Sequence, residues 1–101
     1  MTRRLVAKFA PAFSRDLKKK AVRRQWGLGQ LESVIDLILE NTAESHKVLR
    51  KRHSMHRLSG EWGGSNECHV ANAGDWLVIW RTSDDAAYFQ RTGSCDELFH
   101  K

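Results

Sequence analysis

Apolar residues recur along the chain with two different periodicities, and these periodicities predict the elements of the fold. Residues 4–9 alternate loosely between apolar and polar, which predicts a first strand that Pro11 closes. Residues 28–39 carry leucines and isoleucines three and four positions apart, which predicts an amphipathic helix ending near Asn41. A shorter helix precedes it, with Ser14 as its cap. We therefore expect a helical hairpin directly after the first strand.

The sequence pattern of the second half of the chain predicts short strands separated by turns. Residues 75–81 are almost continuously apolar, as in a central strand covered on both sides, and residues 87–91 alternate as a final strand. Residues 67–70 predict another short strand, whereas the polar, basic residues 42–54 predict a loop or a frayed helix end. The order strand, helix, helix and three strands predicts one α+β domain over residues 1–101, a small antiparallel sheet with the hairpin on one face.

Composition narrows the class of protein. Of the 101 residues, 41% are apolar, which is enough for one modest core and too many for a disordered chain. No apolar run reaches the roughly 20 residues that span a bilayer, and the N-terminus lacks the pattern of a signal peptide. Two cysteines, Cys68 and Cys95, are too few for a disulfide scaffold. We expect a small, soluble, cytoplasmic domain without a membrane partner.

The net charge of +5 conceals a strong asymmetry along the chain. Residues 1–60 carry 14 lysines and arginines against 5 carboxylates, a balance of +9, and residues 61–101 carry 3 against 7, a balance of −4. A basic half favours a polyanionic partner, because lysine and arginine release counterions when they neutralise phosphates. A solvated helix face explains the same pattern equally well. The charge distribution therefore favours a nucleic-acid partner but does not show which nucleic acid is bound.

Side chains that can move protons or bind phosphate gather at the ends of the predicted strands. They are His56, His69, Asp75, Arg91 and Cys95. Histidines, a carboxylate and an arginine can supply a base, an acid and an anion clamp for phosphodiester chemistry. From spacing alone, ordinary half-exposed histidines at turns are the more common explanation. Because the sequence has neither a Cys-x2-Cys pair nor a His-Glu-x-x-His helix, we expect no metal and no cofactor.

Four segments nevertheless occur together in an informative order. They read HRLSGEW, ECHV, DWLVIW and RTGS, at residues 56–62, 67–70, 75–80 and 91–94, and Leu98-Phe99 follows. This run resembles the YafQ branch of the RelE toxin superfamily, the ribonuclease toxins of bacterial type II toxin–antitoxin modules. The matching segments cover residues 56–99, and the predicted hairpin before them fits the RelE-like microbial RNase fold of that family.

The resemblance implies ribosome-dependent cleavage of messenger RNA. In that family the ribose 2′-hydroxyl attacks the adjacent phosphate, giving a 2′,3′-cyclic phosphate and a 5′-hydroxyl end. The positions that match the family's catalytic motifs are His56, His69, Asp75, Arg91 and Phe99. The implied partners are the ribosome, messenger RNA and an acidic antitoxin that acts as a DNA-binding autorepressor in the bacterial cytoplasm. The basic residues expected to bind ribosomal RNA are Lys18, Lys19, Lys20, Arg23, Arg24, Arg50, Lys51 and Arg52.

Two departures from the family pattern bear on activity. Cys95 stands where the family usually has a catalytic histidine, and residues 71–74 form a longer turn than expected before Asp75. Two alternatives therefore stay open: a non-enzymatic gyrase inhibitor of the ParE type, and an RNA-binding module with weakened or absent chemistry. The pair His56 and His69 favours the ribonuclease, because a gyrase inhibitor has no need of acid–base groups.

Overall fold

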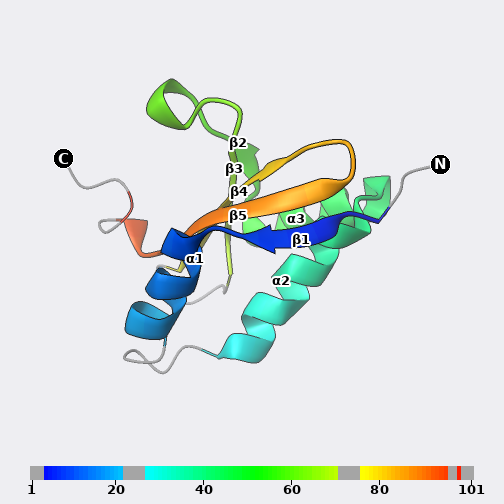
Figure 1. Ribbon diagram of the computed structural model, residues 1–101. Helices are drawn as coiled ribbons and strands as arrows, with labels where there is room; N and C mark the ends of the chain where they lie inside the picture. The colour runs from blue at the N-terminus through cyan, green and yellow to red at the C-terminus, as the bar shows by residue number, and fades with distance from the viewer. Residues whose placement is uncertain (1–3, 22–26, 71–75, 96–97, 99–101) are drawn as a thin grey trace.

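The fold is built on one five-stranded sheet. The computed structural model of the chain describes residues 4–21, 27–70, 76–95 and 98. The strands follow the spatial order β1-β5-β4-β3-β2, so that β4 is central (Figure 1). Their bounds are β1 Val6–Phe9, β2 His56–Arg57, β3 Asn66–His69, β4 Leu77–Thr82 and β5 Ala86–Gly93. The expected α+β class with one sheet is confirmed.

The direction of the first strand differs from the prediction. Strands β2 to β5 form an antiparallel meander, as expected, but β1 runs parallel to β5 along the opposite edge. The helices between β1 and β2 carry the chain across the sheet, and a crossover of this kind allows a parallel neighbour. Hydrophobic alternation is the same for both directions, so the sequence pattern could not distinguish them.

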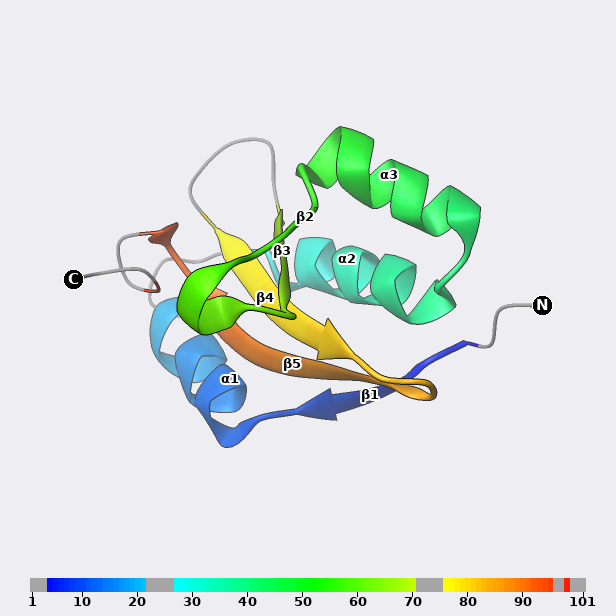
Figure 2. The same cartoon turned by 90° about the horizontal axis from the view of Figure 1, so that it is seen from above.

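The helices also begin and pair differently from the expectation. Their bounds are α1 Pro11–Asp16, a π-helical turn η1 Leu17–Ala21, α2 Leu28–Glu40, α3 Ala43–His53 and a 3-10 turn η2 Gly60–Trp62. Pro11 starts the first helix instead of only closing the strand, because its fixed φ and missing N–H suit the first helical position. Helix α2 packs against α3, whereas α1 packs against β5 (Figure 2). The close helical pair is therefore α2 and α3.

Helix α3 occupies the segment that was predicted to be a loop or a frayed end. A reciprocal capping box starts it: the Ser45 N–H donates to Thr42 Oγ1 at 3.0 Å, and the Thr42 N–H donates to Ser45 Oγ at 2.9 Å. Only Ser45 and Leu49 are buried, so the helix lacks the apolar stripe that would have revealed it. Four basic residues in its last turn suit the negative end of the helix dipole.

The two faces of the sheet differ in what covers them. On one face, Val78 and Trp80 pack into the main core together with Val34 of α2 and Leu49 of α3. On the other face, Leu77 and Ile79 form a small cluster with Leu98 and half-buried residues of the β2–β3 connection. The predicted central strand, buried on both faces, is confirmed. All three α-helices contribute to the main core, and among the described residues none of them contributes to the apolar cluster of Leu77 and Ile79; we call the side of the sheet that carries this cluster the helix-free face.

Candidate active site

Strand pairing places His56, Glu67 and Arg91 side by side across the helix-free face of the sheet, and we call this line of residues the row. The register pairs His56 of β2 with Glu67 of β3, Glu67 with Ile79 of β4, and Ile79 with Arg91 of β5. Directly paired residues share a face, and adjacent strands lie about 4.8 Å apart, so the row spans roughly 14 Å. His69 lies in the neighbouring row, where the register pairs it with Leu77. The sheet therefore brings together three of the predicted catalytic residues.

A β-bulge places Arg91 in this row. The register of β4 and β5 shifts between Ile79 and Trp80, which pair with Arg91 and Phe89, so that Gln90 is the extra residue. In a regular strand Arg91 would share the face of Phe89, which is buried in the main core. The bulge turns the arginine away from that core, as bulges near functional sites commonly do.

His56 is held between two hydrogen-bond acceptors. Its Nδ1 lies 3.0 Å from the carbonyl oxygen of Ser54, and its Nε2 lies 3.4 Å from Glu67 Oε1. Ser54 caps α3 in a left-handed conformation, so the end of that helix fixes the position of the carbonyl. Each ring nitrogen therefore faces one oxygen atom, and about half of the His56 side chain is open to solvent.

Glu67 is a site residue that sequence reasoning did not identify. It is 6% exposed, and its signal was only its place two residues before His69 on the same strand. Burial, and to a lesser extent the charge of Glu67, raises the pKa of the neighbouring Cys68 thiol. Cys68 is therefore a protonated core residue and not a nucleophile.

His69 is half-buried on the same strand, and its backbone is tied to α3. His53 Nδ1 lies 2.8 Å from the His69 carbonyl oxygen. The carbonyl can only accept, so His53 carries a proton on Nδ1. His53 is thus a positioning residue that connects the end of α3 to β3, a role that no sequence pattern indicates.

Arg91 is anchored by a carboxylate that was also missed. Its Nε donates to Asp16 Oδ2 at 2.6 Å, and its Nη2 donates to Asp16 Oδ1 at 3.0 Å. The Thr92 N–H adds a third bond to Asp16 Oδ2 at 3.2 Å, on a part of β5 that lies beyond the last β1 pair, Phe9 with Phe89. Asp16 is 5% exposed. One sequence feature could have drawn attention to Asp16, because it is the sole carboxylate among residues 1–31.

The remaining candidates are placed in part. Cys95 is exposed shortly after the end of β5, and neither cysteine forms a disulfide. Asp75, Phe99 and the turn at 71–74 lie outside the described residues. No group of three potential ligands for a metal ion occurs among the residues that the structure describes.

The predicted ribosome-binding residues that the structure describes form two groups, one near each end of the row. Arg50, Lys51 and Arg52 are exposed on the last turn of α3, which leads through Ser54 to His56. Lys18 and Lys19 are exposed on η1, which follows Asp16 directly. Arg23, Arg24 and the side chain of Lys20 lie outside the described residues. A polyanion crossing the row would meet basic side chains at both ends.

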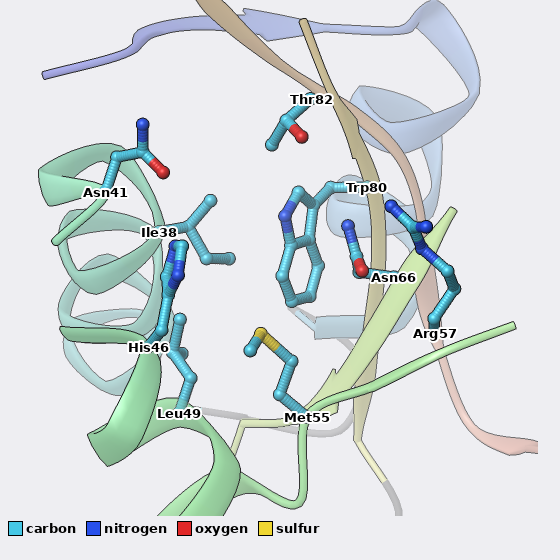
Figure 3. A pocket seen from close by; sticks show the side chains of 9 residues that line it. All are labelled: Ile38, Asn41, His46, Leu49, Met55, Arg57, Asn66, Trp80 and Thr82. Atoms are coloured by element: carbon cyan, nitrogen blue, oxygen red, sulfur yellow. The ribbon is translucent and has the colours of Figure 1, made fainter. Parts of the chain in front are cut away.

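A cavity of about 200 Å³ opens on the other face of the sheet, between the helices and the strands (Figure 3). Trp80 and Met55 project into it, opposite Ile38 and Leu49. Arg57 lines its rim, because it alternates with His56 along β2. Among the predicted catalytic residues that the structure describes, none lines this cavity, so the cavity is separate from the row.

Within the part of the chain that the structure describes, no helix is long and apolar enough to cross a membrane. This finding agrees with the absence of a long apolar run in the sequence.

Comparison with known proteins identifies a family and several relatives. The family described as "Bacterial toxin of type II toxin-antitoxin system, YafQ" matches residues 5–100. The mRNA interferase toxin YafQ of Escherichia coli K12 is 30% identical over 91 residues, which are 90% of this chain and 91% of that protein.

Solved structures give the same result. Crystalline YafQ from E. coli BL21(DE3) matches with a TM-score of 0.80 at 28% identity, over 94% of this chain and 98% of that chain. In the E. coli DinJ–YafQ toxin–antitoxin complex the match has a TM-score of 0.78 at 28% identity, over 95% and 98% of the two chains. The likeness that the four sequence segments predicted is confirmed.

Proposed function

The chain belongs to the YafQ family of bacterial toxins of type II toxin–antitoxin systems, and on this premise we propose that it is an mRNA interferase that cleaves ribosome-bound messenger RNA. The observation that carries the proposal is the row on the helix-free face, where His56, held by buried Glu67, and Arg91, held by buried Asp16, lie in register. Two anchored cationic groups on one open face suit a phosphodiester substrate.

The reaction is an attack of the ribose 2′-hydroxyl on the adjacent phosphorus. The bond from the 2′-oxygen to phosphorus forms while the bond from phosphorus to the 5′-oxygen breaks, which leaves a 2′,3′-cyclic phosphate and a 5′-hydroxyl. One group must take the 2′ proton and another must protonate the leaving oxygen. Extra negative charge develops on the phosphate oxygens and requires fixed positive partners.

The described residues can share these roles. Protonated His56 and the guanidinium of Arg91 supply the positive charge, because each is already fixed by a buried carboxylate. His69 accepts the 2′ proton, since it is half-buried and is the other imidazole that the structure describes on this face. Cys95 follows β5 at the end of the His69 row and donates a proton to the leaving oxygen as a neutral thiol. By the family pattern, Asp75 and Phe99 complete the site, with Phe99 stacking on a base.

The proposed partners are the ribosome, messenger RNA and an antitoxin. The relative YafQ forms a complex with DinJ, and this chain should likewise be neutralised by the antitoxin of its own module. The basic residues near the two ends of the row are the proposed ribosome contacts. They would bind RNA phosphates without reading sequence.

Growth inhibition and transcript integrity in cells test this function. Induction of the wild type should arrest growth and cleave messenger RNA, and His56→Ala or His69→Ala should abolish both effects. The matched control is His46→Ala, because His46 lies on α3 beside the cavity on the other face. If both site variants remain fully toxic and transcripts stay intact, the enzymatic proposal is wrong. Toxicity with intact transcripts and inhibited gyrase would support the ParE-type alternative.

A further inference from the structure

A second line of side chains crosses the helix-free face of the sheet. The register pairs Lys8 of β1 with Tyr88 of β5, and Tyr88 with Arg81 of β4. These three strands are neighbours in the sheet (Figure 2). Ala87 and Phe89, on either side of Tyr88 in the chain, lie in the main core, so Tyr88 points to the opposite face. Directly paired residues share a face, and we call Lys8, Tyr88 and Arg81 the second row.

The second row lies beside the row that carries the candidate catalytic residues. Arg81 follows Ile79 by two positions on β4, and side chains two positions apart in a strand share a face. Ile79 itself lies in the row, between Glu67 and Arg91. Two residues along a strand span roughly 7 Å. The two rows are therefore separated by a distance close to the length of one nucleotide in an extended strand.

All three side chains of the second row are exposed. Tyr88 is 40% exposed although it lies on an interior strand. Lys8 Nζ lies 5.9 Å from the centroid of the Tyr88 ring, near the outer limit of a cation–π contact. Arg81 Nη2 donates to the carbonyl oxygen of Gly63 at 2.8 Å, which holds the guanidinium in place. Neither cation forms an ion pair with a residue that the structure describes, so both charges remain available to a partner.

The usual reasons for polar residues on an exposed strand explain only part of the second row. A lysine on an edge strand discourages pairing with other chains, and β1 is an edge strand. Tyr88 and Arg81 lie on interior strands, whose backbone groups are paired on both sides, so edge protection requires neither of them. An acidic protein segment would bind the two cations and leave the ring unused. Single-stranded RNA uses all three side chains, because its bases stack on aromatic rings and its phosphates bind cations.

We propose that the second row is a subsite for messenger RNA, in which a base next to the cleaved bond stacks on Tyr88 while neighbouring phosphates contact Arg81 and Lys8. Stacking of a base is stronger than a cation–π contact at an exposed site, so the base displaces the Lys8 ammonium from the ring and leaves it to a phosphate. The subsite aligns the strand with the row and reads no sequence, because every base can stack. This inference rests on the proposed function, which brings messenger RNA to the row.

Single-turnover cleavage on programmed ribosomes, measured at increasing concentrations of the chain, tests the stacking. Tyr88→Ala should raise the concentration that gives the half-maximal rate by roughly 5- to 100-fold, which corresponds to about 1–3 kcal/mol for one stacked base. Tyr88→Phe should restore the wild-type value, because it keeps the ring. The matched control is Thr82→Ala, because Thr82 is exposed on β4 but lines the cavity on the other face. Circular dichroism checks that each variant is folded at the assay temperature.

Messenger RNA from which single bases have been removed identifies the RNA that stacks on Tyr88. Bases are removed one at a time on both sides of the cleaved bond. At one position, removal of the base should weaken the wild type as much as Tyr88→Ala does, and it should cost the Tyr88→Ala variant nothing further. If the two losses multiply at every position, the messenger RNA subsite is overturned and the ring is assigned to ribosomal RNA.

A further set of variants tests the charges. Lys8→Gln combined with Arg81→Gln should raise the half-maximal concentration and make it less dependent on salt, whereas Lys47→Gln, at an exposed position on α3, should change neither. Wild-type values in both Tyr88→Ala and the double variant would overturn the subsite. A loss of antitoxin affinity with unchanged cleavage would also overturn it and assign the second row to the antitoxin.

Binding of a labelled single-stranded RNA with a methyl group on every 2′-oxygen separates failure of the subsite from failure of the proposed function. This RNA cannot be cleaved, because its nucleophile is blocked. A wild-type chain that binds it more tightly than Tyr88→Ala does, yet cleaves nothing on ribosomes, would refute the proposed function and support the subsite. Normal cleavage that Tyr88→Ala leaves unchanged would refute the subsite alone. A wild-type chain that neither binds this RNA nor cleaves on ribosomes would refute both.

Discussion

The anchoring of Arg91 by Asp16 makes a prediction that can be worked out from the structure. Asp16→Asn keeps the shape of the side chain but removes its charge and replaces one acceptor with an amide donor. That donor would face a guanidinium and a backbone N–H, neither of which can accept. The substitution should therefore destabilise the fold as well as release Arg91.

The magnitude follows from burial. Removing one partner of a fully buried ion pair costs about 3–5 kcal/mol. Because the Arg91 side chain is 33% exposed, solvent takes up part of the loss, and we expect about 2–3 kcal/mol. One kcal/mol shifts the melting temperature of a domain of this size by about 4–8 °C, so the midpoint should fall by roughly 8–24 °C.

Urea and thermal unfolding, followed by circular dichroism, measure this effect. Glu32→Gln is the control, because Glu32 is exposed on α2 and should change stability by less than about 0.5 kcal/mol. In a double-mutant cycle with Arg91→Gln, the coupling energy should be about 1.5 kcal/mol or more. The reasoning fails if Asp16→Asn unfolds within about 0.5 kcal/mol of the wild type.

The remaining predictions concern single groups in and around the row. Glu67→Gln should lower the single-turnover cleavage rate roughly 10- to 100-fold, because it removes the charge that faces His56 and a polar contact with a charged partner contributes about 1.5–3 kcal/mol. The control is Glu61→Gln, since Glu61 is an exposed acid on η2. An unchanged rate in Glu67→Gln would remove the role of the carboxylate. Cys95→Ala should be impaired by about 10²–10⁴-fold and Cys95→His should keep or exceed wild-type activity. Wild-type activity should fall as pH rises through the titration of a thiol that works in its neutral form, and a fully active alanine variant would move proton donation to a histidine. Ribosome affinity should drop steeply between low and moderate salt, and removing the charges of Arg50, Lys51 and Arg52 should flatten that slope; a flat slope in the wild type would contradict the proposed ribosome contacts.

The parts of the fold that could be predicted from the sequence are those with a strong apolar pattern. The stripe of α2 and the continuous apolar run of β4 are present within a few residues of their expected bounds. Helix α3 was missed because a capping box and a basic C-terminal turn define it, while it buries little apolar surface. The parallel direction of β1 depends on how the chain crosses the sheet, and local patterns do not encode that path.

The residues of the candidate site also divide into those that the sequence predicts and those that only the structure reveals. His56, His69 and Arg91 could be named from their motifs, and the sheet places all three on one side. Their anchors, Glu67 and Asp16, were not named. Glu67 acts through cross-strand register, and Asp16, although it stands out as the sole carboxylate among residues 1–31, acts on a residue 75 positions away. The bulge at Gln90, which decides the face of Arg91, left no mark in the alternation of β5.

Cleavage of messenger RNA on programmed ribosomes in vitro decides whether the chain is a ribosome-dependent ribonuclease. Purified wild-type chain is mixed with a defined messenger RNA, with and without ribosomes, and the RNA ends are analysed chemically. The wild type should give 2′,3′-cyclic phosphate and 5′-hydroxyl ends only when ribosomes are present, and His56→Ala or His69→Ala, at an unchanged melting temperature, should give no such ends. Intact messenger RNA on ribosomes with the wild-type chain, or undiminished cleavage by both histidine variants, would contradict it.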